Sequence, residues 1–365
     1  MKNWKETSEI LSRAIRLAEA GQTASVATVV GIQGSAYRRP GAKFLVQGDG
    51  QTAGSVSGGC LEADVREVAL QVIGGAPPRL LRYETSADDR SPFGLGLGCS
   101  GSVEIFVQPI AGGESLETAK AIRELLAGEA PFAVATPLKG DAAGHTLVVT
   151  GEGVRAGSTN DDALDRGVAA QAADRLSRRE SKRHAAGETE VFTEVFVPPP
   201  HLVVFGAGDD AIPLCAYSSD AGFRVTVVDH REAALSPERF PGAFRRLLLR
   251  PEEGLGSLPV GPSAFAVVMT HSFAHDREWV RRLLAGGVPY VGLLGPRGRG
   301  REILAQIGVN ETESTAGRVF APVGLDLGAE GPEQVALSIV AELLSIHSSR
   351  EPASLREKKG AIHAG

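Results

Sequence analysis

The residues best placed to bind a ligand are two glycines in a stretch whose pattern is strand, tight turn, helix and strand. Gly206 would form the turn, Gly208 would let a phosphate approach the backbone, and Ala211 would let the helix pack closely on the strand. Asp229 ends the second strand about 20 residues later, where a carboxylate can accept hydrogen bonds from a ribose. The order predicts a Rossmann-like unit over residues 201–231 that is a candidate nucleotide site.

The charges around this stretch refine the expected ligand. Asp229 would repel a 2′-phosphate, which favours NAD-like ligands over NADP. Asp209 follows Gly208 at the predicted helix N-terminus, where it would compete with a phosphate for the same positive dipole.

A second glycine-rich loop covers residues 54–62 and contains Ser57, Gly58, Gly59 and Cys60. The residues after it have the apolar spacing of one helical face. The glycines would allow close approach, and free amides at the start of the helix would face the anionic end of a ligand.

A third glycine-rich loop covers residues 94–101 and contains Gly98 and Cys99. The alternating residues after it predict a strand rather than a helix, so this loop is not a second dinucleotide fingerprint. Its backbone amides could still bind an anion or a ring system.

Cys60 and Cys99 are the candidate metal ligands, because thiolate sulfur suits soft metals such as molybdenum. The alternative for each is a small buried hydrophobic residue, which is the expectation for Cys215 inside a helix. His271 ends a predicted strand at the edge where doubly wound sheets bind ligands. Arg38 and Arg297 lie in glycine-rich loops and could clamp a phosphate, or be surface charges.

No nucleophile, base and orienting acid stand together in the sequence, so no catalytic residue is predicted.

The chain has 365 residues, of which 42% are hydrophobic and 22% charged, enough to bury the cores of two or three domains. A formal net charge of -6 without a basic block argues against nucleic-acid binding. Three cysteines, none in a Cys-x-x-Cys pair, and the lack of a membrane-length apolar run predict a cytoplasmic protein.

The elements predict an α/β protein with a smaller α+β part before a doubly wound parallel sheet. We expect an N-terminal domain over residues 1–110, a connecting α+β region over 111–197, a Rossmann-like domain over 201–347 and a disordered tail over 348–365. Residues 295–301 are expected to be a loop. The sequence reveals no internal repeat and no Walker A loop.

Several separated motifs together resemble the XdhC/CoxI family, accessory factors of molybdenum hydroxylases such as xanthine dehydrogenase. The motifs lie at residues 34–35, 38, 40–43, 54–62, 96–99, 205–208, 227–231, 270–271, 276, 292–297 and 322–326. The chain departs from the family pattern at Asp209, where histidine is usual, and at Ser100, where glycine is frequent.

The resemblance implies a protein that binds the molybdenum cofactor (molybdopterin), protects its sulfurated form and inserts it into the hydroxylase. It also implies a cysteine desulfurase as a further partner and a homo-oligomer as a candidate assembly. The expected cofactor-binding residues are Arg38, Ser57, Gly58, Gly59, Cys60, Gly98, Cys99, Gly206, Gly208, Asp229, His271, Gly295 and Arg297.

Two other functions compete with this one. The glycines at 206 and 208, with His271 as acid or base, would also fit an NAD(P)-dependent oxidoreductase. A purely structural protein that only docks on a partner would bind neither ligand.

Overall fold

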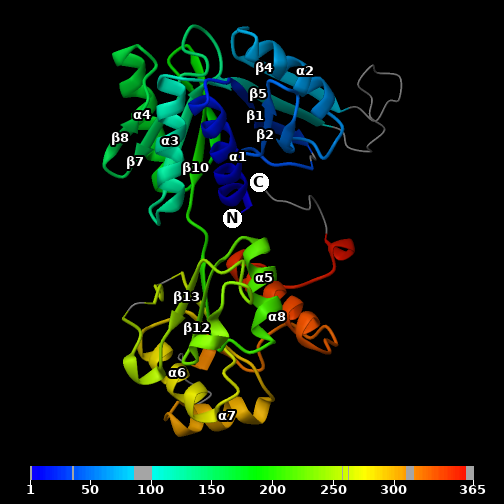
Figure 1. Cartoon of the computed structure of the whole chain (residues 1–365), viewed down its shortest axis with the longest axis vertical. Coiled ribbons are helices and arrows are strands. Elements are labelled where there is room, and N and C mark those ends of the chain that lie inside the picture. The colour runs from blue at the N-terminus through cyan, green and yellow to red at the C-terminus, as the bar shows by residue number, and fades with distance from the viewer. Residues whose placement is uncertain are drawn as a thin grey trace. The chain divides into compact units, whose positions relative to one another are not determined.

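The computed structural model in Figure 1 describes residues 2–34, 37–85, 101–256, 258–261, 263–309 and 316–358. The chain divides into two compact units, residues 2–198 and 199–365. The boundary expected between residues 110 and 111 falls inside the first unit, where it separates two sheets. In the described parts of both units, every helix is too short or too polar to traverse a bilayer.

The first unit consists of helices and antiparallel strands. In chain order these are α1 (Lys2–Glu19), β1 (Ala24–Gly34), β2 (Lys43–Gln47), β3 (Thr52–Gly54), α2 (Glu62–Ile73), β4 (Arg79–Thr85), β5 (Gly101–Ile110), α3 (Glu114–Ala127), β6 (Phe132–Pro137), β7 (Leu147–Thr150), β8 (Gly153–Ala156), α4 (Asp162–Arg178), β9 (Lys182–Ala186) and β10 (Thr189–Phe196).

These elements form the same motif twice. Each half has a helix, three strands, a second helix and two further strands. The two sheets have the orders β3-β2-β1-β5-β4 and β8-β7-β6-β10-β9, so every strand has a counterpart at the same place in the other sheet. Corresponding pairs across the central strands are Val26–Gln108 with Val134–Glu194, and Thr28–Phe106 with Thr136–Phe192.

A trace of this duplication survives in the sequence. Ala-Gly-Ser occurs before α2 and again before α4, and each serine is followed at the same distance by an acid, Glu62 or Asp165. Gly54 and Gly157 have φ of +83° and +84°, and a Cβ on either would collide with the backbone of β2 or of the residue preceding β7. The expectation of no internal repeat is therefore wrong, because the halves share positions that turns and packing require rather than overall identity.

Successive side chains of a strand point to opposite faces of its sheet, so the two faces of each sheet carry different residues. In the first sheet, Ala27 and Val29 pack under α2, and in the second, Ala133 and Ala135 pack under α4. The opposite faces share a core with α1 and α3, which includes Trp4. In each half, one face of the sheet is thus covered by the half's own helix, α2 or α4, and the other face packs toward the other half.

The second unit is a parallel sheet with helices on both faces. Its elements are β11 (His201–Phe205), α5 (Ala211–Ala221), β12 (Arg224–Asp229), β13 (Arg245–Leu248), β14 (Phe265–Val268), α6 (Phe273–Ala285), β15 (Tyr290–Leu293), α7 (Arg297–Gln306), β16 (Val319–Phe320) and α8 (Pro332–His347). Short 3-10 turns lie at 232–235, 251–253, 316–318 and 355–357.

The strand order β13-β12-β11-β14-β15-β16 is that of doubly wound dinucleotide-binding folds. Helices α5 and α8 pack on one face, and α6 and α7 on the other. Residues of β11, β12, β14 and β15 are almost fully buried, as expected for a sheet covered on both sides. The predicted α/β class with a doubly wound parallel sheet is confirmed.

Some local expectations need correction. Residues 297–301 belong to helix α7 rather than to a loop, since Pro296 occupies the N-cap and Gly300 fits against Ala321. From residues 24–30 alone the sequence predicts a strand that ends at residue 30, whereas β1 continues to Gly34 because its last residues pair with β5 after a bulge. Strands β8, β9 and β13 were not expected, since all three are short edge strands with exposed or basic residues.

Candidate functional site

The loop of residues 54–62 is organised by a carboxylate from within the chain. Glu62, the first residue of α2, folds back over it, and Ser55 Oγ donates to Glu62 Oε1 at 2.7 Å. The hydroxyl of Ser57 donates to the other oxygen. At 2.9 to 3.3 Å, the carboxylate also accepts hydrogen bonds from the backbone N–H groups of Val56, Ser57, Gly58 and Gly59.

This arrangement changes what the loop can bind. Burial alone would raise the pKa of Glu62, but the hydrogen bonds from Ser57, Ser55 and the backbone lower that pKa to about 2. Glu62 is therefore an anion that fills the cradle of amides, and it also sits at the positive end of the α2 dipole. Free amides at the start of the helix were expected to face a ligand. The amides of residues 56–59, in the loop before that helix, donate to Glu62, and the Leu61 amide donates to Ser57 Oγ at 2.9 Å.

A depression of about 560 Å³ lies beside these glycines, and part of its wall is Tyr37, Gly58, Gly59 and Arg66. Tyr37 is 82% exposed, and a Cβ on Gly58 would lie 2.8 Å from its ring. Among the described residues, no atom lies within 4 Å of a Cβ added to Gly59. A flat ring could stack on Tyr37 while its edge approaches the glycine backbone.

Two other residues predicted for this site have defined surroundings. Cys60 is exposed, so its thiol is not packed as a small hydrophobic side chain. Arg38 lines the same depression, but its guanidinium contacts both carboxylate oxygens of Glu6 at 2.5 Å, which orients it toward α1. A free phosphate clamp at Arg38 would require this ion pair to open.

The predicted metal site is only partly covered by the structure. Gly98 and Cys99 lie outside the described residues, so a shared role of Cys60 and Cys99 stays a prediction. Within the described ranges, no group of three or more His, Cys, Asp or Glu residues is arranged to hold a metal ion. Cys215 is buried in α5, as expected, and burial raises the pKa of its thiol to about 11.

The second group of predicted residues meets at the carboxyl edge of the parallel sheet. Gly206 has a φ of +115°, and a Cβ there would lie 2.5 Å from the carbonyl oxygen of Met269 at the end of β14. Gly208 lies beside His271, whose ring is 3.6 Å from the position of an added Cβ. His271 itself has a φ of +60° and places Nε2 3.3 Å from Asp210 Oδ2. The topology thus brings Gly206, Gly208 and His271 together, as expected for a switch point.

Asp229 is at the same edge, but its oxygens already have donors. Oδ2 accepts from the backbone N–H of Ala207 at 2.7 Å, and the Arg231 guanidinium donates to both oxygens at 2.9 Å. Burial opposes ionisation, yet the hydrogen bonds from Arg231 and Ala207 lower the pKa of Asp229 to about 2. The carboxylate fixes the glycine turn from inside, and a ribose would have to displace Arg231 to reach it.

Gly295 and Arg297 follow β15 at this edge. Gly295 has a φ of +132° and lies against Arg299, while Arg297 is exposed at the start of α7. Arg299 donates to the buried carboxylate of Asp276 at 2.6 Å, and Asp276 also accepts from Thr270. Arg297 is therefore better placed than Arg299 to meet an anion.

Sequence reasoning missed the two side chains that shape the first site. Glu62 stood in the quoted motif but had no assigned role, although a carboxylate one turn after a Ser-x-Ser-Gly-Gly loop is a local signal for such a cap. No sequence pattern could have assigned Tyr37 to the site, because its position over Gly58 depends on how two loops that are separate in sequence pack together.

Comparison with known proteins gives matches along most of the chain. The XdhC and CoxI family model matches residues 17–84, and the XdhC Rossmann domain model matches residues 202–343. The chain is 32% identical to a protein of Bacillus subtilis that is named as a probable subunit of xanthine dehydrogenase, over 90% of this chain and 94% of that protein.

Two further matches are informative. The molybdenum cofactor insertion chaperone PaoD of Escherichia coli is 34% identical over 29% of this chain and 33% of its own length. A crystal structure described as a xanthine dehydrogenase from Bacillus halodurans is 29% identical, covers 96% of this chain and 98% of its own, and has a TM-score of 0.76. From the two family matches and the near full-length relative, the chain belongs to the XdhC and CoxI family.

Proposed function

We propose that this protein binds the molybdenum cofactor and delivers it to a molybdenum hydroxylase of the xanthine dehydrogenase type in the cytoplasm. The observation that carries the proposal is the exposed Gly58-Gly59-Cys60 turn beside an open depression, in a chain of this family. The insertion chaperone among the relatives supports the same function.

The residue types in the depression fit an anionic cofactor that contains a ring system. Tyr37 offers an exposed aromatic side chain for stacking. Arg66 donates from Nε to the Gly50 carbonyl at 3.0 Å, and within the described part of the chain its terminal nitrogens are left for a phosphate. Cys60, the residue that follows Gly59 in the chain, has an exposed thiol. When bound, the cofactor supplies a redox-active molybdenum centre, and this chain's residues would hold it and limit its contact with water.

Protection of the sulfurated form and exchange with a cysteine desulfurase are finer parts of this proposal. Both would use the thiol of Cys60, since sulfur is a soft ligand and this residue is accessible.

The alternative, an NAD(P)-dependent oxidoreductase, would need Asp229 to accept from a ribose, whereas Arg231 and Ala207 occupy its oxygens. Tight binding of NAD(H) or NADP(H) with hydride transfer would overturn the carrier function.

Gly59→Val should abolish retention of the cofactor, because the new side chain projects into the depression. The measurement is the molybdopterin content of protein purified from a molybdopterin-producing host, by mass spectrometry. Gly75→Val is a matched control, since Gly75 also has a positive φ and open space around it but lies at the other end of α2. Equal retention by Gly59→Val and the wild type would refute the assignment of this site.

Cys60→Ser should change the free energy of unfolding by less than about 0.5 kcal/mol, because the side chain is exposed. The pterin should still bind, while its terminal sulfido group is lost faster. The yield of active partner hydroxylase, measured beside cyanolysable sulfur, tests this. A fully competent Cys60→Ser protein would leave the thiol without a chemical role.

A further inference from the structure

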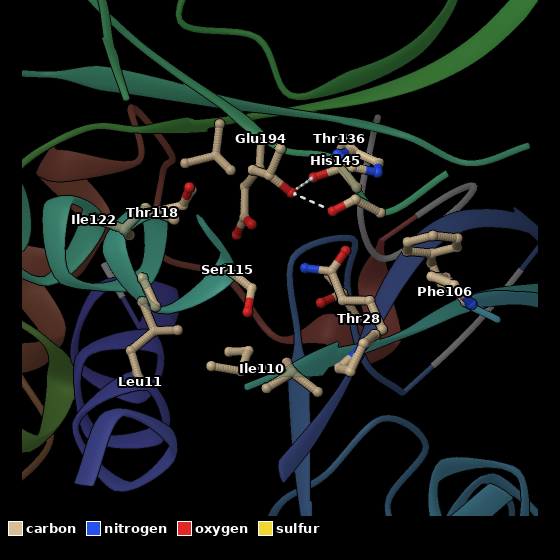
Figure 2. A pocket seen from close by; sticks show the side chains of 18 of the residues that line it. Leu11, Thr28, Phe106, Ile110, Ser115, Thr118, Ile122, Thr136, His145 and Glu194 are labelled. Atoms are coloured by element: carbon tan, nitrogen blue, oxygen red, sulfur yellow. Dashed lines mark hydrogen bonds between the residues drawn. The ribbon is translucent and has the colours of Figure 1, made fainter. Parts of the chain in front are cut away.

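A cavity of about 410 Å³ lies inside the first unit, between its two repeats. It is bounded by the inner faces of both sheets and by helices α1 and α3. Figure 2 shows Glu194 and Thr136 on one side of it and Thr28, Ile110 and Leu11 on the other. Its size is that of a small-molecule site.

The two repeats supply the same positions to the cavity wall. The strand registers make five pairs of lining residues equivalent, namely Val26 with Val134, Thr28 with Thr136, Phe106 with Phe192, Gln108 with Glu194, and Ile110 with Phe196. Phe106 and Phe192 belong to one small core cluster, where the halves meet. The cavity is therefore a product of the duplicated architecture and not a packing defect in one half.

Three polar atoms of the wall are buried and have no hydrogen-bond partner among the described residues. They are Thr7 Oγ1, Gln108 Oε1 and Glu194 Oε1. Thr7 is 1% exposed and Glu194 6%. A buried acceptor without a donor loses the hydrogen bonds that it would make in water. Three such oxygens around one cavity therefore indicate that a bound molecule or water pairs with them.

The charges in the cavity limit what that molecule can be. Lys43 Nζ contacts Glu194 Oε2 at 2.6 Å and also donates to the Gly41 carbonyl. Burial raises the pKa of Glu194 although Lys43 opposes this. The one lysine of the wall is thus neutralised, and His145 and Glu114 are the other titratable lining residues. Lys43, the one Lys or Arg among the described lining residues, is thus already paired and would not be free to bind an anion such as a phosphate ester.

We propose that this cavity binds an uncharged, flat heterocycle that presents at least two N–H donors, to Gln108 Oε1 and Glu194 Oε1. The phenylalanine, leucine, isoleucine and valine side chains of the wall provide the apolar contact for its faces. This site is separate from the depression proposed for the anionic molybdenum cofactor, and neither proposal depends on the other.

The test uses the full chain and two matched compounds. Benzimidazol-2-one is a neutral flat bicycle with two N–H donors, and its 1,3-dimethyl derivative keeps the ring but has none. By calorimetric titration we expect the parent to bind with a Kd of about 0.1–1 mM and the dimethyl compound at least about tenfold more weakly. In Gln108→Met, which keeps the chain length but removes the acceptor, affinity for the parent should fall about tenfold.

Gln51→Met, at an exposed position of the same unit, is the matched control and should bind like the wild type. Gln108→Met should be at least as resistant to urea as the wild type, because an unpaired buried acceptor is gone. Absence of saturable binding of the parent up to about 10 mM would overturn the proposal and assign the acceptors to water. Equal binding of the two compounds, or unchanged affinity in Gln108→Met, would also overturn it.

Discussion

Replacing Glu62 with alanine should lower the free energy of unfolding of the first unit by about 3 kcal/mol. The substitution removes the acceptor from four backbone N–H groups and two hydroxyls in one step. Because the loop is partly exposed, water can replace some of these bonds, which keeps the loss below the sum of six buried ones. The glycine turn should lose its shape together with this stability, and cofactor retention should fall with it.

Each unit has its own tryptophan, which makes this measurable. Trp4 lies in the first unit and Trp279 in the second. In a Trp279→Phe background, urea unfolding followed by fluorescence reports on the first unit alone. Glu67→Ala is the control, since Glu67 is exposed on the same helix and should cost less than about 0.5 kcal/mol. Equal effects of the two substitutions would show that Glu62 does not organise the loop.

The Glu62 carboxylate also predicts how the free energy of unfolding depends on pH. The pKa of Glu62 is about 2 in the folded protein, against an ordinary value of 4.5. A lowered pKa stabilises the fold above the ordinary value, and this contribution is lost as the pH falls from about 4.5 toward 2. We expect roughly 2 kcal/mol after allowance for solvent screening, and the difference between wild type and Glu62→Ala should shrink over this range.

Gly206→Ala should destabilise the second unit by about 3 kcal/mol or more. The residue has a φ of +115°, and the added Cβ would lie 2.5 Å from Met269 O and 2.8 Å from its carbonyl carbon. Since these are backbone atoms at the end of β14, they cannot rotate away, and β11 and β14 must separate.

Gly208→Ala is the matched control, because its Cβ would make only ordinary contacts at 3.6 Å with His271. It should cost less than about 1 kcal/mol. Unfolding followed through Trp279 in a Trp4→Phe background separates the two. A Gly206→Ala protein as stable as Gly208→Ala would mean that the turn can relax, contrary to the geometry.

The βαβ unit could be predicted from sequence because its information is local. The glycine turn, the helix and Asp229 follow within one stretch, and the structure places all three as expected. The partners of Asp229 could not be predicted in the same way. Whether its carboxylate accepts from a ligand or from Ala207 and Arg231 depends on side-chain directions that spacing does not determine.

The duplication of the first unit was missed for a different reason. A sheet needs alternating burial, turn glycines and a helix cap, and many sequences satisfy these requirements. The two halves therefore keep the same register while most side chains differ. The residues that remain alike include Ala-Gly-Ser with the acid that follows it, and three pairs in the central strands, Val26 with Val134, Thr28 with Thr136 and Phe106 with Phe192. The cavity between the halves could not be predicted from the sequence either, because its walls come from strands that are distant in sequence.

Two identical walls would accept an unsymmetrical ligand in two opposite orientations of equal energy, so such a cavity could not distinguish one end of the molecule from the other. The repeats differ where this matters: Glu194 stands where the other half has Gln108, and Lys43 stands beside only one of them. An ion pair at one end of the cavity and an amide at the other make the two orientations unequal in energy. Differences at a few positions are thus sufficient for a cavity between two similar halves to distinguish the two ends of a ligand.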